Sequence, residues 1–334
     1  MFRVESVEPE RWSEADWVRS YALHCSANQE QGSHARPLAA YRMSHVTPPG
    51  GRPRLHWVAR DGEAIVGKLD LTLTAAAPDL AVIGLFVMSE ARRRGVGSAL
   101  LREALGVAQE SGALDVHGSV ARPANWAICE RLGGRFELAM AQRVLSLEDA
   151  NWRLAQQWCA AAALRSASTQ IVQFERVPDE FAATLLELNR HARAEVPRSW
   201  SHGSDAPSLA LRREQERRHQ LLGWRWLTLA TLEADGTLSG LTDVTYDPSQ
   251  PDLVRQNLTV VLPAYRGRGL AKWLKAAMLA TMNQQFPAAK RLVTLNANAN
   301  APMLAINHEL GFGEAAHHRI YEFDLAALRA RLCR

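Results

Sequence analysis

The sequence predicts an α/β fold built twice: two similar domains in tandem, each with a mixed, mostly antiparallel sheet flanked by helices. An apolar strand, a turn rich in arginine and glycine, and an amphipathic helix follow one another at two places. The glycines at the same place in the two turns, Gly95 and Gly269, are 174 residues apart. A second pair of landmarks, Leu132-Gly133 and Leu310-Gly311, repeats at 178 residues. Two landmarks with nearly one spacing indicate a domain written twice.

Length and composition agree with two ordinary domains. The 334 residues are long for one domain and comfortable for two, and 47% of them are hydrophobic, enough for two cores. We therefore expect an N-terminal domain over 1–148, a linker helix over 149–168 and a C-terminal domain over 169–334. The net charge of +4 is weak for a nucleic-acid binder, which usually concentrates more basic charge.

In the first half, alternating or continuous apolar residues predict strands, and apolar residues at helical spacing predict helices. Asp61-Gly62 is a tight-turn signal, so the residues around it are expected to form a hairpin. The expected strands are 2–7, 55–59, 64–74, 82–88, 114–120 and 136–147, and the expected helices are 8–23, 38–43, 99–108 and 125–132.

The second half repeats this order after the linker helix. Asp235-Gly236 follows Asp61-Gly62 at the same spacing of 174 residues and predicts the matching hairpin. The charged helix at 208–220 is expected to be solvated. The expected strands are 171–177, 224–232, 237–246, 258–262, 291–296 and 317–323, and the other expected helices are 178–194, 270–279 and one ending at Leu310-Gly311. The agreement of the two orders favours duplication over one fold with a long insertion.

The two turns have the chemistry of an anion site. Pro263 ends the strand of the second half because proline cannot donate to a ladder. The first N–H groups of the following helix lack partners, and the helix dipole adds positive charge, so phosphate binds well there. Glycine lets a bulky anion approach the backbone. A dinucleotide fingerprint would need a third glycine where Leu100 and Leu274 stand, so that type of binding is disfavoured.

These motifs resemble the GNAT superfamily of N-acetyltransferases. Arg92-x-x-Gly95-x-Gly97 and Arg266-x-x-Gly269-x-Ala271 are similar to its acyl-CoA pyrophosphate loop. The later signature Asn300-x-x-Met303-x-x-Ile306-Asn307-x-x-Leu310-Gly311-Phe312 is clear, and Arg122-x-x-Asn125-x-x-Ile128-Cys129-x-x-Leu132-Gly133-Gly134 is its weaker first copy. The resemblance covers nearly the whole chain as two GNAT-like domains, as in tandem proteins such as mycothiol synthase, which the chain resembles distantly.

The resemblance implies that acetyl-CoA binds along the end of each central strand, the turn and the start of the following helix. In the first half these residues are Phe86, Val87, Met88, Arg92, Arg93, Arg94, Gly95, Val96, Gly97 and Ser98. In the second half they are Val260, Val261, Leu262, Arg266, Gly267, Arg268, Gly269, Leu270, Ala271 and Lys272, with Asn300 and Met303 on the later helix. Oxyanion donors are implied around Val87-Met88 and Val261-Leu262.

The superfamily transfers acetyl directly from acetyl-CoA to an amine, and a tyrosine on the distal helix often protonates the departing thiolate. Here Asn307 and Cys129 stand at that place, and an asparagine cannot serve as a general acid. Water, Tyr321 or Tyr265 remain open as replacements. Asp243 is the candidate base, with Asp70 as its weaker counterpart in the first half. The catalytic candidates are therefore Asn307, Tyr321 and Asp243.

We expect an acetyl-CoA-dependent N-acetyltransferase that acts on a primary amine of a small molecule or peptide in a ternary complex. The second half is expected to transfer, because its distal signature is fuller. The alternative is a non-catalytic acyl-CoA-binding or regulatory protein, which the missing tyrosine would suit.

Other parts of the sequence set expectations about metals, partners and location. The four cysteines lack ligand spacing, so no metal is expected. No signal-peptide or membrane-spanning pattern is present, so we expect a cytoplasmic protein without nucleic-acid or membrane partners. It would be a monomer whose two domains pack as a pseudo-dimer, or a homodimer.

Overall fold

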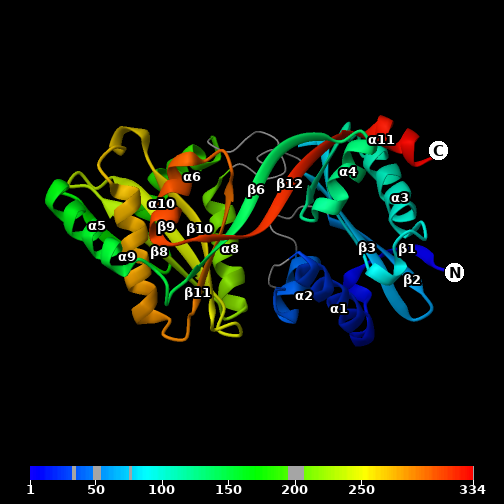
Figure 1. Cartoon of the computed structure of the whole chain (residues 1–334), viewed down its shortest axis with the longest axis horizontal. Coiled ribbons are helices and arrows are strands. Elements are labelled where there is room, and N and C mark those ends of the chain that lie inside the picture. The colour runs from blue at the N-terminus through cyan, green and yellow to red at the C-terminus, as the bar shows by residue number, and fades with distance from the viewer. Residues whose placement is uncertain (32–34, 48–53, 75–76, 195–206, 334) are drawn as a thin grey trace. The chain divides into compact units, whose positions relative to one another are not determined.

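The computed structural model describes residues 1–31, 35–47, 54–74, 77–194 and 207–333 (Figure 1). The chain divides into two compact units. The described residues of 1–140 and 316–334 form unit 1, and those of 141–194 and 207–315 form unit 2. The units differ from the predicted sequence halves at one place in each: 141–148 belong to unit 2, and 316–334 belong to unit 1. The expected linker helix lies within unit 2.

Unit 1 contains one mixed sheet of the order β1-β2-β3-β4-β5-β12. Its strands are β1 (Arg3–Val7), β2 (Arg54–Asp61), β3 (Ala64–Thr74), β4 (Ala77–Val87), β5 (Asp115–Val120) and β12 (Gly313–Asp324). Only β4 and β5 pair in parallel, and the other neighbours are antiparallel. Because β12 pairs with β5, the last strand of the sequence completes the sheet of unit 1.

Helices cover both faces of this sheet. They are α1 (Glu14–Glu30), α2 (Leu38–Val46), α3 (Val96–Glu110), α4 (Pro123–Arg131) and α11 (Leu325–Leu332). Trp57, Leu69 and Leu71 pack against α3 and α11, which lie side by side in Figure 1, and Val58 packs against α1. The first helix starts later than expected, at Glu14, because Ser13 and Asp16 form a capping box there. The sequence reading did not predict α11.

Unit 2 has the order β6-β11-β10-β9-β8-β7. Its strands are β6 (Arg135–Ser146), of which the part from Ala141 on belongs to this unit, β7 (Gln170–Phe174), β8 (Arg225–Leu232), β9 (Leu238–Tyr246), β10 (Leu253–Val261) and β11 (Arg291–Ala297). The pair β10–β11 is parallel, and the neighbouring pairs β7–β8, β8–β9 and β9–β10 are antiparallel. The prediction of a mixed, mostly antiparallel sheet in each domain is confirmed.

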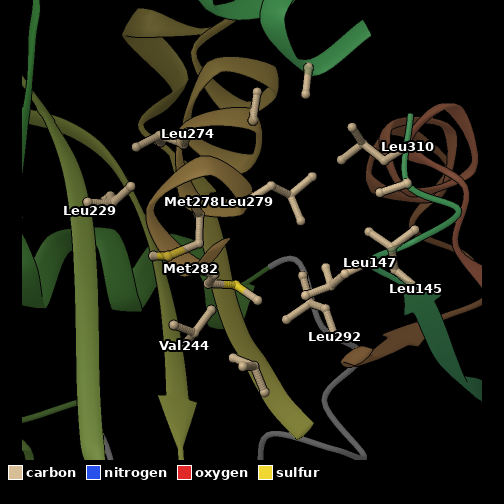
Figure 2. Packing of buried hydrophobic residues seen from close by; sticks show 14 of the residues in the cluster. Leu145, Leu147, Leu229, Val244, Leu274, Met278, Leu279, Met282, Leu292 and Leu310 are labelled. Atoms are coloured by element: carbon tan, nitrogen blue, oxygen red, sulfur yellow. The ribbon is translucent and has the colours of Figure 1, made fainter. Parts of the chain in front are cut away.

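The helices of unit 2 are α5 (Trp152–Arg165), α6 (Ala182–Ala194), α8 (Leu209–Leu221), α9 (Leu270–Gln285) and α10 (Ala301–Leu310). Figure 2 shows Leu274, Met278 and Met282 of α9 on the side of the helix that faces Leu229 and Val244 of the sheet. These side chains recur at helical spacing, so burial of one face against the sheet fixes α9 in place. In the part of the chain that the structure describes, no helix is long and apolar enough to span a membrane.

Candidate coenzyme-binding and acid–base sites

Each arginine–glycine turn starts its helix on a glycine in the left-handed region. Gly95 (φ 83°) precedes α3, and Gly269 (φ 80°) precedes α9. A second left-handed residue lies two positions earlier, Arg93 (φ 60°) in unit 1 and Gly267 (φ 79°) in unit 2. Because a side chain is strained in this region, unit 1 forms the same turn with more strain than unit 2. The predicted strand, turn and helix are confirmed in both units.

The backbone amides of both turns are open. Within the described residues, no backbone hydrogen bond starts from the N–H groups of 93–98 or of 267–272. The next residues, Ala99 and Trp273, make the first helical bonds, each 3.0 Å long. Unpaired amides at the positive end of a helix dipole attract anions. Each turn can therefore hold a phosphate or diphosphate group.

The first arginine of each turn braces the turn against the strand before it. Arg92 Nε donates to the carbonyl of Val87 at 2.9 Å, and Arg266 Nε donates to that of Val261 at 3.1 Å. Four cations of the two turns are already paired with carboxylates. The pairs are Arg92 with Glu30 (2.6 Å), Arg94 with Asp61 (2.7 Å), Arg268 with Glu233 (3.2 Å) and Lys272 with Glu309 (2.8 Å). A phosphate would have to compete with these carboxylates, so the amides are the stronger part of the anion site.

The sheet opens beside each turn-bearing strand. In unit 1, β4 pairs with β5 only over 80–83, although β4 continues to Val87. In unit 2, β10 pairs with β11 only over 253–255, although β10 continues to Val261. The later residues of each strand therefore present unpaired backbone groups toward the strand from which they have separated.

The unpaired edges of β4 and β10 show which of the predicted oxyanion donors are free of backbone partners. The N–H groups of Met88 and Leu262 donate to the neighbouring antiparallel strand, each at 2.9 Å. Because successive N–H groups of a strand point to opposite sides, those of Val87 and Val261 point toward the opening. The donors available for an oxyanion are those two, and the other two predicted ones are engaged.

A buried polar network lies where β10 and β11 separate in unit 2. Lys275 Nζ, on α9, donates to Gln256 Oε1 on β10 and to Asn307 Oδ1 on α10, both at 2.6 Å. Asn307 Nδ2 donates to Asn296 Oδ1 on β11 at 2.9 Å. Asn307 is 0% exposed and Lys275 is 3% exposed. The network links the two diverging strands through both helices.

Asp243 lies on the other face of the sheet, beside a bulge in β10 between Gln256 and Thr259. Its Oδ1 accepts from the Leu258 N–H at 3.0 Å, and its Oδ2 accepts from Arg212 at 3.3 Å. Asp243 is only 2% exposed. Both oxygens of the predicted base therefore accept hydrogen bonds, and the bond to Leu258 holds the bulge of β10 in place. The charged helix α8 buries Arg212 against Asp243, so the expected solvated face is wrong, although an i,i+4 pair of the expected kind, Arg212–Glu216, is present at 2.9 Å.

We expect Asp243→Asn to act mainly on stability. The amide oxygen can still accept from Leu258, while the charge opposite Arg212 is lost, which costs about 1–3 kcal/mol of unfolding free energy. Urea unfolding measures this loss. Removal of a general base would lower kcat about 10²- to 10⁴-fold, so a loss of that size in a folded variant would show that Asp243 takes a proton.

The catalytic candidates belong to different units. Tyr321 lies in unit 1, where its hydroxyl donates to Glu130 of α4 at 3.2 Å, whereas Asn307 and Asp243 lie in unit 2. Tyr321, one of the possible replacements for the missing tyrosine, is carried by β12 into the sheet of unit 1. Tyr265 is half-buried and packs on the core of unit 2.

Unit 1 has no counterpart of the lysine network. At the repeat spacings of 174 and 178, Gln256, Lys275 and Asn307 correspond to Val82, Leu101 and Cys129. Leu101 belongs to the core of unit 1, and Cys129 packs against it. Burial raises the pKa of the Cys129 thiol to about 11, so this thiol is not a reactive thiolate at neutral pH.

Unit 1 instead buries a cluster of titratable groups between α2, β2 and β3. The carboxylate of Asp70 lies 2.7 Å from His56 Nδ1, 3.2 Å from Lys68 Nζ and 3.8 Å from His45 Nε2. Lys68 also donates to the hydroxyl of Tyr41 at 3.1 Å and contacts His45 Nε2. Asp70 pairs across the strands with Gly84 of β4, so the cluster borders the turn-bearing strand.

This cluster has the ligand types of a metal site. The donor atoms of His45, His56 and Asp70 lie within 4.8 Å of one another. Two imidazoles and a carboxylate suit zinc or iron. The ammonium of Lys68, however, contacts both His45 and Asp70. The chain thereby supplies its own cation, and these residues fit a metal poorly.

The sequence analysis did not single out Lys275, Lys68 or the two histidines beside Lys68, and it named Asp70 only as the weaker counterpart of Asp243. Lys275 stands between Ala271 and Leu279 at the spacing of the apolar face of α9, which was a usable signal of burial. The partners of Lys68 come from α2, β2 and β3, and no local pattern links them.

Residues 17–133 match the family model of the acetyltransferase (GNAT) family. The structure agrees with this match. Each unit has a strand, a turn with unpaired amides and a helix, and its parallel strand pair separates beside the turn. Residues 17–133 therefore match a GNAT acetyltransferase domain, and the chain has the fold of a tandem GNAT protein. No curated protein sequence matches the chain.

Solved structures share this fold over nearly the whole chain. A tandem GNAT protein from the clavulanic acid biosynthesis pathway, solved without AcCoA, is 23% identical with a TM-score of 0.80, and the match covers 97% of this chain and 99% of that one. A GCN5-related N-acetyltransferase from Sphaerobacter thermophilus is 14% identical with a TM-score of 0.65, covering 97% and 96%. A glucosamine N-acetyltransferase region of a fungal multi-domain GH3 β-N-acetylglucosaminidase is 14% identical with a TM-score of 0.68, covering 97% of this chain and 38% of that one.

Proposed function

We propose that the protein is an N-acetyltransferase that moves an acetyl group from acetyl-CoA to a primary amine of a small molecule or peptide. The amine attacks directly while both substrates are bound, and unit 2 carries out the transfer. One observation carries the proposal: open amides at the start of α9 lie at the end of a strand that has separated from its parallel neighbour. A diphosphate with a peptide-like arm suits both features.

The two features fit different parts of coenzyme A. The amides of 267–272 would hold the diphosphate at the helix terminus, where no proton or metal is needed. The pantetheine arm contains two amide groups, which can pair with the exposed edge of β10 as a neighbouring strand would. An N–H on the unpaired stretch of β10 that follows Arg255 and ends at Val261 would then face the thioester oxygen and stabilise the charge that develops there.

The polar network favours unit 2 as the transferring half. Proton transfer must accompany the conversion of an amine and a thioester into an amide and a thiol, and unit 2 has buried polar groups at the opening. The corresponding residues of unit 1 are Val82, Leu101 and Cys129, which offer no ready acid at neutral pH.

A second candidate function applies to unit 1: binding of an acyl-CoA without transfer. Its open amides at 93–98 favour it, together with the apolar residues at its strand opening. Such a unit would hold a coenzyme molecule for structural or regulatory purposes.

Calorimetry with acetyl-CoA and a turnover assay test these proposals together. We expect the full chain to bind acetyl-CoA and to acetylate at least one class of amine from a panel of simple amines, amino sugars, aminoglycosides and peptides, with products identified by mass spectrometry. Binding without turnover over the whole panel would favour the non-catalytic alternative. Absence of binding would refute both.

A further inference from the structure

Lys275 is a buried lysine without a carboxylate partner. It is 3% exposed, and no Asp or Glu lies within ion-pair distance of its Nζ among the residues that the structure describes. Its contacts are two amide oxygens, of Gln256 and Asn307, and the ring of Phe312, whose centroid is 5.0 Å away. Lysine is almost never fully buried unless it is paired, because the desolvation of the ammonium is costly. A purely structural role is therefore a poor explanation.

The position of Lys275 ties it to the opening of the sheet. Gln256 is the first residue of β10 beyond its pairing with β11, and Asn307 reaches Asn296 on β11. The Nζ therefore lies at the point where the two strands separate. It stands on α9, the same helix whose first turn carries the open amides. One rigid helix thus connects the anion site with this amine.

The protonation state of Lys275 is poised near neutrality. Burial lowers the pKa of its ammonium from the usual value to about 7. Burial disfavours the charged ammonium, whereas the hydrogen bonds to the two amide oxygens favour it. With a pKa of about 7, both the ammonium and the neutral amine are present at neutral pH. A group with these properties is well matched to proton transfer.

We propose that Lys275 is the proton donor to the thiolate that leaves when unit 2 cleaves the acetyl-CoA thioester, with Asn307 and Gln256 holding its ammonium in place. The proposal rests on the function proposed above. It also gives a reason for the asparagine at position 307, which cannot donate a proton to the thiolate itself but can orient the lysine that does.

The step balances in atoms and charge. The amine nitrogen attacks the acetyl carbon, the C–S bond breaks, and its electron pair remains on sulfur. The thiolate takes a proton from Lys275 Nζ, and the proton released by the attacking nitrogen returns to Nζ through solvent. A thiol has a pKa of about 8.5, so transfer from a lysine of lower pKa is downhill, whereas an ordinary lysine of about 10.4 would oppose it.

The experiment uses the full chain with Lys275→Met and Lys275→Arg, and with Lys290→Met as the control. Lys290 is exposed in the same unit, so its variant makes the same substitution away from the network. We expect Lys275→Met to keep its affinity for acetyl-CoA within about threefold and to lower kcat about 100-fold or more, the usual effect of a lost general acid. Arginine stays charged, so Lys275→Arg is not expected to restore kcat.

The pH profile separates proton donation from a structural role. In the wild type, kcat should fall as pH rises above about 7, because the ammonium loses its proton. That decline should be absent in Lys275→Met and unchanged in Lys290→Met. If Lys275→Met had the kcat of the wild type and the same fall of kcat above about pH 7, the proposal would be overturned.

A direct titration covers the case in which Lys275→Met does not fold. The chain has only four lysines, so NMR of lysine-labelled wild-type protein can resolve them. We expect one signal to titrate near neutral pH and to shift when coenzyme A is added. A set of four ordinary lysine titrations would overturn the role of Lys275 even if the chain transfers acetyl groups. Failure of acetyl-CoA to bind the wild type would instead refute the function on which the role rests.

Discussion

Gly269→Glu is expected to abolish acetyl-CoA binding in unit 2 and, with it, acetyl transfer. Residue 269 has φ 80°, where a side chain costs roughly 1–2 kcal/mol. The glutamate would also place a negative charge among the open amides that would hold the diphosphate. Together these effects should weaken binding at least about 100-fold, since each 1.4 kcal/mol is a factor of ten. Calorimetry should show one fewer binding site per chain than the wild type.

Gly95→Glu is the matched control, because Gly95 has the same place and nearly the same φ, 83°, in unit 1. It should remove the binding site of unit 1 and leave transfer by unit 2 intact. Circular dichroism and thermal unfolding check that both variants fold. Unchanged stoichiometry and affinity in Gly269→Glu would contradict the anion site, and loss of transfer only in Gly95→Glu would move catalysis to unit 1.

The turns could be predicted from the sequence because their chemistry is local. A strand ending at a proline or a glycine-rich turn, left-handed glycines and an apolar helical face all lie within a few dozen residues. The repeat then strengthened each copy, and Gly95 and Gly269 both occupy the expected place before a helix. Local signals of this kind are the most reliable ones in a sequence.

The sheet that β12 joins could not be predicted in the same way. The alternation of β12 specifies a strand with two faces, but it does not specify which sheet the strand joins. The predicted domain 169–334 therefore included Tyr321, whereas its strand joins the sheet of unit 1. The partners of Asp243 were missed for a related reason: Arg212 meets it only when α8 packs on the sheet, and the charge pattern of that helix alone favours solvent.

Asp70→Asn is expected to give the largest loss of stability among the changes considered. The carboxylate of Asp70 is the counter-ion of Lys68, whose side chain is 7% exposed, and it also binds His56. Its removal leaves a buried ammonium without an opposite charge, which typically costs about 3–5 kcal/mol. Urea unfolding of the full chain should show this loss in unit 1. Asp79→Asn, in the same unit, is the control, because the exposed carboxylate of Asp79 makes no ion pair among the residues that the structure describes.

The pH dependence of the same pair gives a second readout. Burial alone would raise the pKa of the Asp70 carboxyl, but Lys68 and the two histidines hold it well below its usual value. A carboxyl whose folded pKa is lowered stabilises the fold above its unfolded pKa of about 3.9, and that contribution is lost as pH falls through the folded value. The wild type should therefore lose stability in acid faster than Asp70→Asn, so that the two unfolding free energies converge below about pH 4. A difference that stays constant as pH falls below about 4 would show that Asp70 does not act through its charge.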